Sequence, residues 1–269
     1  MTAPRFGRPL HVFDEVTSTN DIALDLVREG APEGAAVIAG SQTRGRGRDG
    51  RTWLSAPGRG LWLSIVLRPG LTYPDSGLLP VVAGSGLVLA LRDLGLPALV
   101  KWPNDIWVRG RKIAGVLVES CSNGGRLEAA VVGVGLNCLL PASENLRYPV
   151  TALRVEAEAA GVVLPSREAV LDIVLDRLER AYLLLKAAGP HPFLRAWPSL
   201  SAHHGRPVTA FGPAGKMAGL SGPLQPDGCL ELLLPDGERR LLNSAELGLH
   251  AGPPGRWEER AGTKVPDRP

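Results

Sequence analysis

Positive charge is concentrated in residues 42–53, QTRGRGRDGRTW, where four arginines are spaced by glycines and Asp49 is the one acid. Glycine lets a backbone approach a ligand closely and exposes its N–H groups. The planar arginine fork fits phosphate oxygens. The pattern favours a phosphate-bearing ligand, while a solvated loop or an RNA-binding segment remains open. It is not a Walker loop, because the chain contains no GxxxxGK[ST].

Two further segments carry cations at the ends of apolar runs. KWPNDIW (101–107) places a lysine, an amide and a carboxylate at a strand end, although Asn104–Asp105 can equally be a simple turn. RKIAGVLVES (111–120) opens with Lys112, and Gly115 follows it on the strand. Lys112 is either a cation over a pocket floored by Gly115 or a lysine that extends to solvent.

Two polar or glycine-bearing segments complete the set. GVGLN (133–137) leaves a bare strip of sheet on which a flat ligand can lie, or it marks a bulge. Ser18-Thr19-Asn20 stands at a helix start, where it either caps the helix or holds a polar ligand group together with the helix amides.

The elements that position these segments follow from periodicity and turn residues. We expect helices at 17–30, 78–95 and 166–189, and strands at 35–42, 60–69, 98–105, 106–120 (turning at Arg109–Gly110–Arg111) and 126–138. The hairpin signal SNGG (122–125) predicts an antiparallel or mixed sheet rather than a Rossmann alternation. Beyond about residue 200, short strands joined by Gly-rich turns predict a small all-β unit, and 251–269 is predicted to be disordered.

Composition bounds the function classes. The chain has 269 residues and a net charge of +3, so it is not a general polyanion binder. Three distant cysteines fit a reducing cytosol, and the apolar stretch 78–95 is interpreted as a buried helix rather than a membrane span. His203–His204 is interpreted as a solvated loop pair, and no metal site from protein side chains is expected.

In this order, the motifs STN, GRGRxGRxW, KWPND, KIAG and GxGxN together resemble the biotin–protein ligase family over nearly the whole chain. The resemblance implies an α+β fold: a class II aminoacyl-tRNA synthetase-like catalytic domain (1–200), with a mixed, largely antiparallel sheet and flanking helices, followed by an SH3-like β-barrel (204–250). It implies activation of biotin with ATP and Mg²⁺ to biotinyl-5′-AMP. The biotinyl group then passes to a lysine of a biotin carboxyl carrier protein.

The resemblance also assigns residues. It implies that biotin is bound by Ser18, Thr19, Asn20, Gln42, Arg46, Gly47, Arg48, Lys112, Gly115, Gly133 and Gly135. It implies that ATP and the adenylate are bound by Arg46, Arg48, Arg51, Trp53, Asn104, Asp105, Lys112 and Asn137. Arg48, Lys112 and Asp105 are the expected catalytic residues.

The sequence departs from the family pattern at Arg44, an extra charge, and at Asp49, which stands where a basic residue is common and can pair with a neighbouring arginine. The STN motif begins at residue 18, so we expect the monofunctional type without an N-terminal DNA-binding domain, in the cytoplasm, and the resemblance suggests a homodimer. The rival interpretations are a lipoate–protein ligase and an RNA-binding module that uses the arginine loop.

Overall fold

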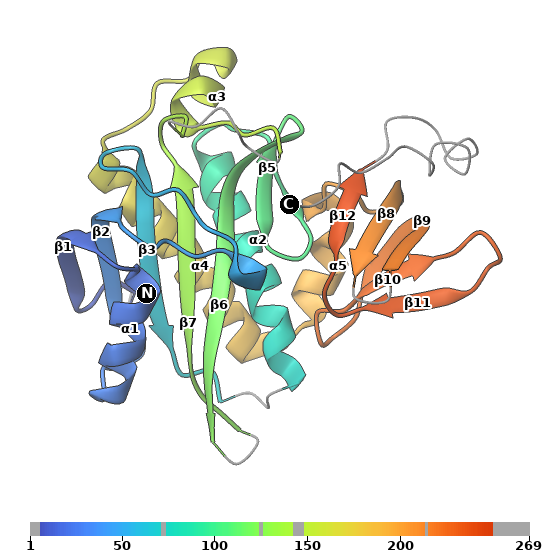
Figure 1. Ribbon diagram of the computed structural model, residues 1–269, viewed down its shortest axis with the longest axis horizontal. Coiled ribbons are helices and arrows are strands. Elements are labelled where there is room, and N and C mark those ends of the chain that lie inside the picture. Colours follow the sequence, from blue (N-terminus) through green and yellow to red (C-terminus); the bar gives the residue numbers. More distant parts are fainter. Residues whose placement is uncertain (1–5, 71–73, 124–125, 142–147, 213–214, 250–269) are drawn as a thin grey trace.

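The computed structural model describes residues 6–70, 74–123, 126–141, 148–212 and 215–249. The segment 251–269, predicted to be disordered, lies outside the described residues, as do Gly124 and Gly125 of the predicted hairpin turn. The larger body is a seven-stranded sheet with helices on both faces, and a smaller sheet adjoins it (Figure 1).

The seven-stranded sheet has the order β1-β2-β3-β7-β6-β5-β4. Its strands are β1 (Leu10–Val16), β2 (Ala36–Gln42), β3 (Gly60–Leu67), β4 (Ala98–Lys101), β5 (Asp105–Val108), β6 (Arg111–Asn123) and β7 (Arg126–Asn137). β1 and β2 are parallel, and every other neighbouring pair is antiparallel. The predicted mixed, largely antiparallel sheet is therefore confirmed.

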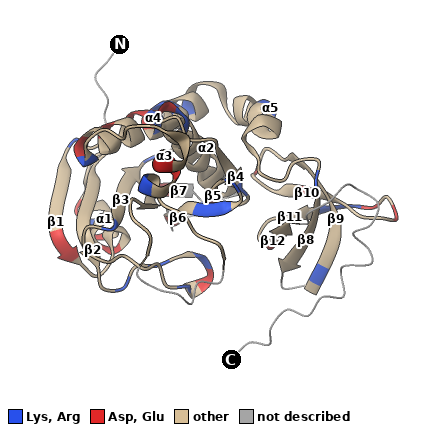
Figure 2. Cartoon of the chain, turned by 90° about the horizontal axis from the view of Figure 1, so that it is seen from above, with Lys and Arg blue, Asp and Glu red and all other residues tan. Residues whose placement is uncertain are grey.

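The helices are α1 (Thr19–Arg28), α2 (Leu79–Asp93), α3 (Leu153–Ala160), α4 (Arg167–Ala188) and α5 (His191–Leu200), with short 3-10 turns at Arg48–Gly50 and Pro74–Leu78. α2 and α4 cover one face of the sheet, and α1 lies on the other (Figure 2). The alternation along β3 matches this arrangement: Leu63 and Ile65 belong to the core under α2 and α4, whereas Val66 packs in the cluster beneath α1. The second face is left open over β6 and β7, and the site lies there.

The apolar stretch predicted to be a buried helix is α2. A window from Ser76 to Asp93 is long and apolar enough to span a membrane by composition, and 67% of it is buried inside the protein. α4 passes so near that a Cβ on Gly86 would lie 2.9 Å from the Arg177 carbonyl oxygen. This close packing explains why a helix interior tolerates glycine here.

The C-terminal unit is a five-stranded antiparallel sheet of order β11-β10-β9-β8-β12. Its strands are β8 (Pro207–Gly212), β9 (Gly215–Leu224), β10 (Leu230–Leu233), β11 (Arg239–Leu242) and β12 (Glu246–Leu249). The predicted small all-β unit is therefore present. Hydrogen bonds connect the C-terminal unit to the larger sheet: the Ala202 N–H donates to the Val100 carbonyl, and Trp102 Nε1 donates to the Gly228 carbonyl.

The interpretation of His203–His204 as a solvated pair is wrong for His203. This side chain is completely buried where the two sheets meet. Its Nε2 accepts from the Trp102 N–H at 3.0 Å, and its Nδ1 lies 2.7 Å from the Ser221 hydroxyl. His204 is half-buried, and its Nδ1 lies 2.9 Å from the Gly222 carbonyl. Tertiary packing, which the local sequence does not reveal, buries His203 completely and His204 in part.

Candidate functional site

All the site residues predicted from the sequence line one cavity of about 230 Å³. They come from the start of α1, the end of β2 and the loop that follows it, the β4–β5 turn and the start of β5, the first half of β6 and the second half of β7. Lys101 of the KWPND motif also lines it, and residues that the sequence did not single out complete the wall: Trp102, Tyr148, Val150 and, from the C-terminal sheet, Ala245, Glu246 and Leu247. The cavity therefore lies where the two sheets adjoin.

The start of α1 forms a buried polar wall. Ser18 is the N-cap residue, but its side chain makes no capping hydrogen bond. Gln42 Oε1 accepts instead from the Thr19 backbone N–H at 2.8 Å and from the Thr19 hydroxyl at 3.1 Å. The Ser64 hydroxyl lies 2.7 Å from Thr19 Oγ1 and 2.6 Å from Asn20 Oδ1. This wall presents fixed donors and acceptors suited to a neutral polar group.

The glycines of β6 and β7 make room for protein side chains. A Cβ on Gly135 would lie 2.5 Å from Trp53 Nε1, and one on Gly115 would lie 2.9 Å from the same ring. A Cβ on Gly133 would lie 2.3 Å from Asn20 Oδ1. The strip of sheet at Gly115 and Gly135, which we expected to be open to a flat ligand, is covered in this structure by the indole of Trp53.

The loop arginines are paired with acids and with the C-terminal sheet. Arg46 contacts Asp21 at 2.6 Å and Glu119 at 3.0 Å. Arg48 donates from Nη2 to the Ala245 carbonyl at 2.9 Å, and Arg51 forms an ion pair of 2.8 Å with Glu246. The second sheet therefore holds the loop against the cavity.

Asp49 has a local role in the same loop. Its backbone is left-handed, with φ of 59°, and its carboxylate lies 3.2 Å from Arg48 Nε and 3.9 Å from Arg51 Nη2. The suggestion that Asp49 pairs with a neighbouring arginine is therefore confirmed. Arg44 is exposed, and it is not among the residues that line the cavity.

Lys112 and Asp105 face each other at the opposite wall. Lys112 Nζ lies 2.6 Å from Asp105 Oδ1 and 4.9 Å from the centroid of the Trp53 ring. The amides of Asn104 and Asn137 donate to backbone carbonyls, of Val116 at 2.8 Å and Thr151 at 3.1 Å. These two asparagines consequently hold the backbone around the cavity as well as lining it.

The segment carrying Tyr148 and Val150 was missed by the sequence reasoning. It pairs with the main chain of Lys112, whose N–H donates to Pro149 and whose carbonyl accepts from Thr151. Buried Glu156 secures it: one oxygen lies 2.6 Å from the Thr151 hydroxyl, and its carboxylate pairs with Arg109 and Arg111, each at 2.6 Å. Burial raises the pKa of Glu156, but these hydrogen bonds and charges outweigh it, and the pKa is lowered overall. The carboxylate is therefore charged at neutral pH.

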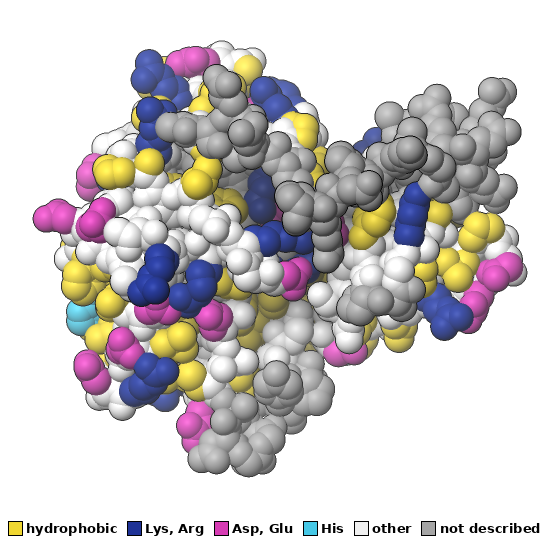
Figure 3. All heavy atoms as spheres, in the orientation of Figure 1, with side chains coloured by type: hydrophobic (Ala, Val, Ile, Leu, Met, Phe, Trp, Pro, Cys, Tyr) yellow, Lys and Arg dark blue, Asp and Glu magenta, His cyan; other side chains and the backbone are white. Residues whose placement is uncertain are grey.

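The cavity thus joins a neutral polar end near α1 to a cationic end near the C-terminal sheet. Basic and acidic side chains lie next to one another on this face of the molecule (Figure 3). Such a site can hold an elongated ligand with a neutral head and an anionic tail, and it can align two anionic groups for reaction with each other.

Comparison with known proteins places this geometry in context. The model of the biotin/lipoate A/B protein ligase family matches residues 12–137. A bifunctional ligase/repressor BirA from Bacillus subtilis is 30% identical over 247 residues, covering 90% of this chain and 75% of the relative. A biotin–[acetyl-CoA-carboxylase] ligase from Paracoccus denitrificans is 32% identical, covering 86% of this chain and 96% of the relative. The structure of a biotin protein ligase from Aquifex aeolicus in complex with biotin and ATP superposes with a TM-score of 0.73 at 30% identity, covering 90% of this chain and 99% of that one.

Proposed function

The chain belongs to the biotin/lipoate A/B protein ligase family, and on that premise we propose that the cavity between its two sheets is where biotin is joined to AMP. The activity is that of a biotin protein ligase: ATP-dependent activation of biotin, followed by transfer of the biotinyl group. The acceptor is a lysine of a biotin carboxyl carrier protein.

The neutral polar end of the cavity suits the ureido ring of biotin. Ser18, Thr19, Asn20 and Gln42 supply hydroxyl, amide and backbone groups that are already oriented by one another. Position 133 must be glycine because the Asn20 side chain lies directly against it. Gly133 therefore affects the ligand indirectly, by leaving room for Asn20. The valerate chain then runs along the apolar middle of the cavity toward the cations.

The cationic end suits the chemistry of adenylation. A carboxylate oxygen of biotin bonds to the α-phosphorus, and the bond from that phosphorus to the bridging oxygen breaks, with the electron pair leaving on pyrophosphate. Because two anions meet, cations and alignment lower the barrier, and no nucleophilic side chain is needed. Arg48, Arg51 and Lys112 supply cations at this end, and Arg46, which pairs with Asp21 and Glu119, supplies one nearer α1.

The remaining assignments follow the same geometry. Trp53 lies over Gly115 and Gly135 with Lys112 at its face, which offers the adenine a ring to stack on. Asp105 is the carboxylate beside Lys112, and we assign it to the incoming acceptor amine. Magnesium fits here as an ion held by ATP phosphates, because Asp105 and Glu246 are oxygen donors that line the cavity.

Several finer features are proposed on the same basis. Residues 1–200 form the catalytic domain, similar to class II aminoacyl-tRNA synthetases, and 204–250 form a unit with an SH3-like arrangement of its five strands. A homodimer and a cytoplasmic location fit this class of enzyme.

The observation that carries the proposal is the convergence of five separate motifs on one cavity with a neutral and a cationic end. The lipoate–protein ligase alternative does not account for the paired GRGRxGR and KWPND motifs, and the relatives reported above are biotin ligases. An RNA-binding role would need loop cations that are available to a phosphate backbone, whereas Arg46, Arg48 and Arg51 are each paired with an acid.

The direct test is transfer of labelled biotin to a purified carrier domain, together with biotin-dependent exchange of labelled pyrophosphate into ATP. We expect Lys112→Ala to keep the thermal midpoint and to lower exchange at least a hundredfold. Lys216→Ala, on an exposed part of β9, is the matched control and should retain full exchange. Normal exchange in Lys112→Ala would refute the role assigned to Lys112, and no transfer by the wild type would refute the function.

A further inference from the structure

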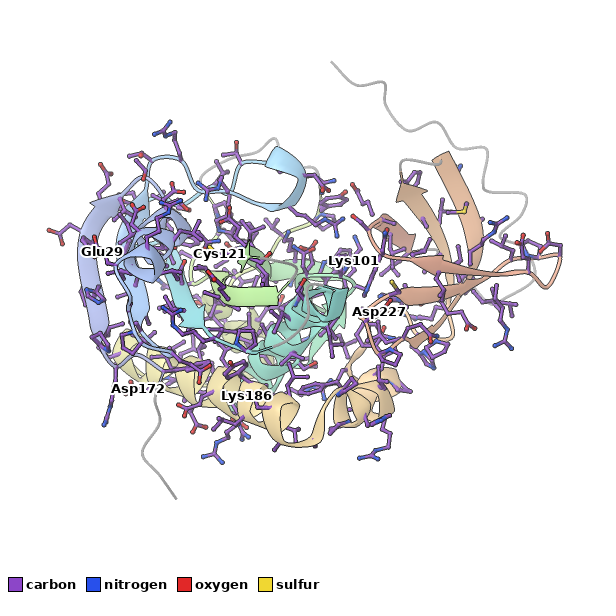
Figure 4. The ribbon with its side chains drawn as sticks, turned by 90° about the horizontal axis from the view of Figure 1, so that it is seen from below. Glu29, Lys101, Cys121, Asp172, Lys186 and Asp227 are labelled. Atoms are coloured by element: carbon purple, nitrogen blue, oxygen red, sulfur yellow. The ribbon has the colours of Figure 1, made fainter. Side chains whose placement is uncertain are left out.

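The arginine loop (42–53) is closed at its base by main-chain hydrogen bonds. The Gln42 N–H donates to the Ser55 carbonyl at 3.0 Å, and the Trp53 N–H donates to the Gly45 carbonyl at 2.9 Å. These four residues are called the loop base below. Figure 4 shows the loop in light blue, reaching from the side of α1 toward the C-terminal sheet. The geometry of the loop base therefore sets where the loop residues lie over the cavity.

One buried hydroxyl connects the two sides of the loop base through a side chain. Ser55 is only 5% exposed, and it is not among the residues that line the cavity. Its hydroxyl accepts from Gln42 Nε2 at 2.7 Å and donates to the Trp53 carbonyl at 3.2 Å. A serine hydroxyl has a single hydrogen, so these two bonds use its donor and one of its lone pairs in fixed directions.

Gly45 shows how closely the two sides approach each other. A Cβ at this position would lie 2.5 Å from the Trp53 carbonyl oxygen and 2.6 Å from Ser55 Oγ. A side chain here would push apart the two groups that are hydrogen-bonded to each other, so the close approach requires glycine. The first glycine of the GRGR run therefore serves the loop base.

Ser55 also decides which way the Gln42 amide points. Gln42 Oε1 accepts from the Thr19 N–H, and Nε2 donates to Ser55. If the amide were turned over, Nε2 would face the Thr19 N–H, and two donors would meet. One of the two Nε2 hydrogens goes to Ser55, which leaves the other for a ligand acceptor in the cavity that Gln42 lines.

The second partner of Ser55 belongs to a residue at the other side of the cavity. The Trp53 ring covers Gly115 and Gly135, and Lys112 Nζ lies 4.9 Å from the centroid of the ring. The ring lies against the sheet while the main-chain carbonyl of the same residue is bonded to Ser55. A shift of that carbonyl would therefore move the ring over the two glycines.

We propose that Ser55 is a positioning residue for both substrates: its hydroxyl orients the Gln42 amide at the biotin head and holds the Trp53 main chain beside the nucleotide. This inference rests on the proposed adenylation, in which Gln42 and Trp53 contact the two substrates. Because one hydroxyl holds both groups, its removal weakens the binding of biotin and of ATP together. A serine that only fills space in the core would affect neither.

The first test measures biotin-dependent pyrophosphate exchange by Ser55→Ala. We expect the KM for biotin to rise at least fivefold and the KM for ATP at least threefold, with kcat within about threefold of the wild type. A purely structural role would give the opposite pattern, because a partly unfolded preparation lowers the apparent kcat and leaves both KM values unchanged. Ser41→Ala is the matched control: Ser41 is 4% exposed, but its hydroxyl donates to Glu15, and the variant should have wild-type kinetic constants.

A double-mutant cycle shows whether Ser55 acts on biotin through Gln42. Titration calorimetry measures biotin affinity for the wild type, Ser55→Ala, Gln42→Ala and the double variant. Without the Gln42 amide, Ser55→Ala should change biotin affinity by less than about twofold, against at least fivefold in the wild-type background. Additive losses would overturn the proposal, and so would an unchanged KM for biotin in Ser55→Ala.

Hydrogen–deuterium exchange, measured by mass spectrometry, tests the loop base without any ligand. In Ser55→Ala the peptides that cover 42–55 should take up deuterium at least tenfold faster, whereas those of α2 should match the wild type. Equal uptake at 42–55 in the two proteins would show that the hydroxyl does not hold the loop. Failure of the proposed function gives a different result: the wild type would neither exchange pyrophosphate nor bind biotin, while deuterium uptake at 42–55 would still respond to Ser55→Ala.

Discussion

Acid should destabilise this protein through His203, and the size of the effect can be worked out from its surroundings. Burial, and secondarily the charge of Lys101, lowers the pKa of His203 to about 3. The Trp102 N–H donates to Nε2, so Nε2 carries no proton in the native state and Nδ1 donates to Ser221. A second proton on the ring would have to bind Nε2, where it would point at the Trp102 N–H. This geometry explains why the pKa of His203 is lowered.

The sign follows from linkage. In the unfolded chain the imidazole takes up a proton with a pKa of roughly 6.5, whereas in the folded protein it stays neutral until about pH 3. Its contribution to stability is therefore complete above about pH 6.5 and is lost as the pH falls from there toward 3. Between pH 7.5 and pH 5.0 the loss is about 2 kcal/mol, at roughly 1.4 kcal/mol for each pH unit below 6.5.

Urea unfolding at these two pH values, for the wild type and His203→Gln, measures this contribution. Glutamine retains an acceptor near the position of Nε2 but cannot titrate. At pH 7.5 the variant should lose about 1 kcal/mol for the missing bond to Ser221. The further loss on going to pH 5.0 should be about 2 kcal/mol smaller in the variant than in the wild type.

The neighbouring histidine provides the control. His204→Gln changes a half-buried imidazole on the same turn and leaves His203 in place, so it should retain the His203 contribution to the acid loss. Parallel changes in stability for the wild type and His203→Gln would show that His203 is protonated in the folded state, and the reasoning from burial would then be wrong.

Two other predictions concern positions that support the site. Gly135→Ala places a methyl group 2.5 Å from Trp53 Nε1, so the ring must move; we expect biotin-dependent pyrophosphate exchange to fall at least tenfold, with about 1–3 kcal/mol lost in urea unfolding. Wild-type exchange in that variant would show that the position of Trp53 is unimportant. Glu156→Gln removes the charge that pairs with Arg109 and Arg111, and because both guanidiniums reach solvent we expect a loss of about 1–3 kcal/mol, less than for a fully buried pair. Unfolding curves of Glu156→Gln that coincide with those of the wild type would contradict this.

Elements with strong local signals were predictable from the sequence. α4 has a regular apolar period, Ser166 as a bonded N-cap and Gly189 at its end. β6 and β7 pair as the SNGG turn predicts. β1 was missed because it is an edge strand with six of its seven residues exposed or half-buried, so it lacks an apolar alternation. α5 was missed because Pro198 lies inside it, which usually indicates a helix end.

The site was predictable only where its residues fall in motifs. The five motifs each lie at the end or middle of a strand, or at a helix start, that reaches the cavity. Tyr148 and Glu246 come from segments without a motif, and only the tertiary fold brings them to the same wall. Lys101 lies inside KWPND, but its burial is a product of the tertiary fold and is not encoded locally.

The ion pairs around the cavity also explain how so basic a loop occurs in a chain of modest net charge. Five cations line the cavity: Arg46, Arg48, Arg51, Lys101 and Lys112. Four of them, Arg46, Arg48, Arg51 and Lys112, are paired with the carboxylates of Asp21, Glu119, Asp49, Glu246 and Asp105, so their positive charges are offset within this cluster. A nucleic-acid backbone would have to break several of these pairs at once, whereas a compact anionic ligand enters the cavity among cations that are already held in place. Neutralising the loop therefore disfavours extended polyanions.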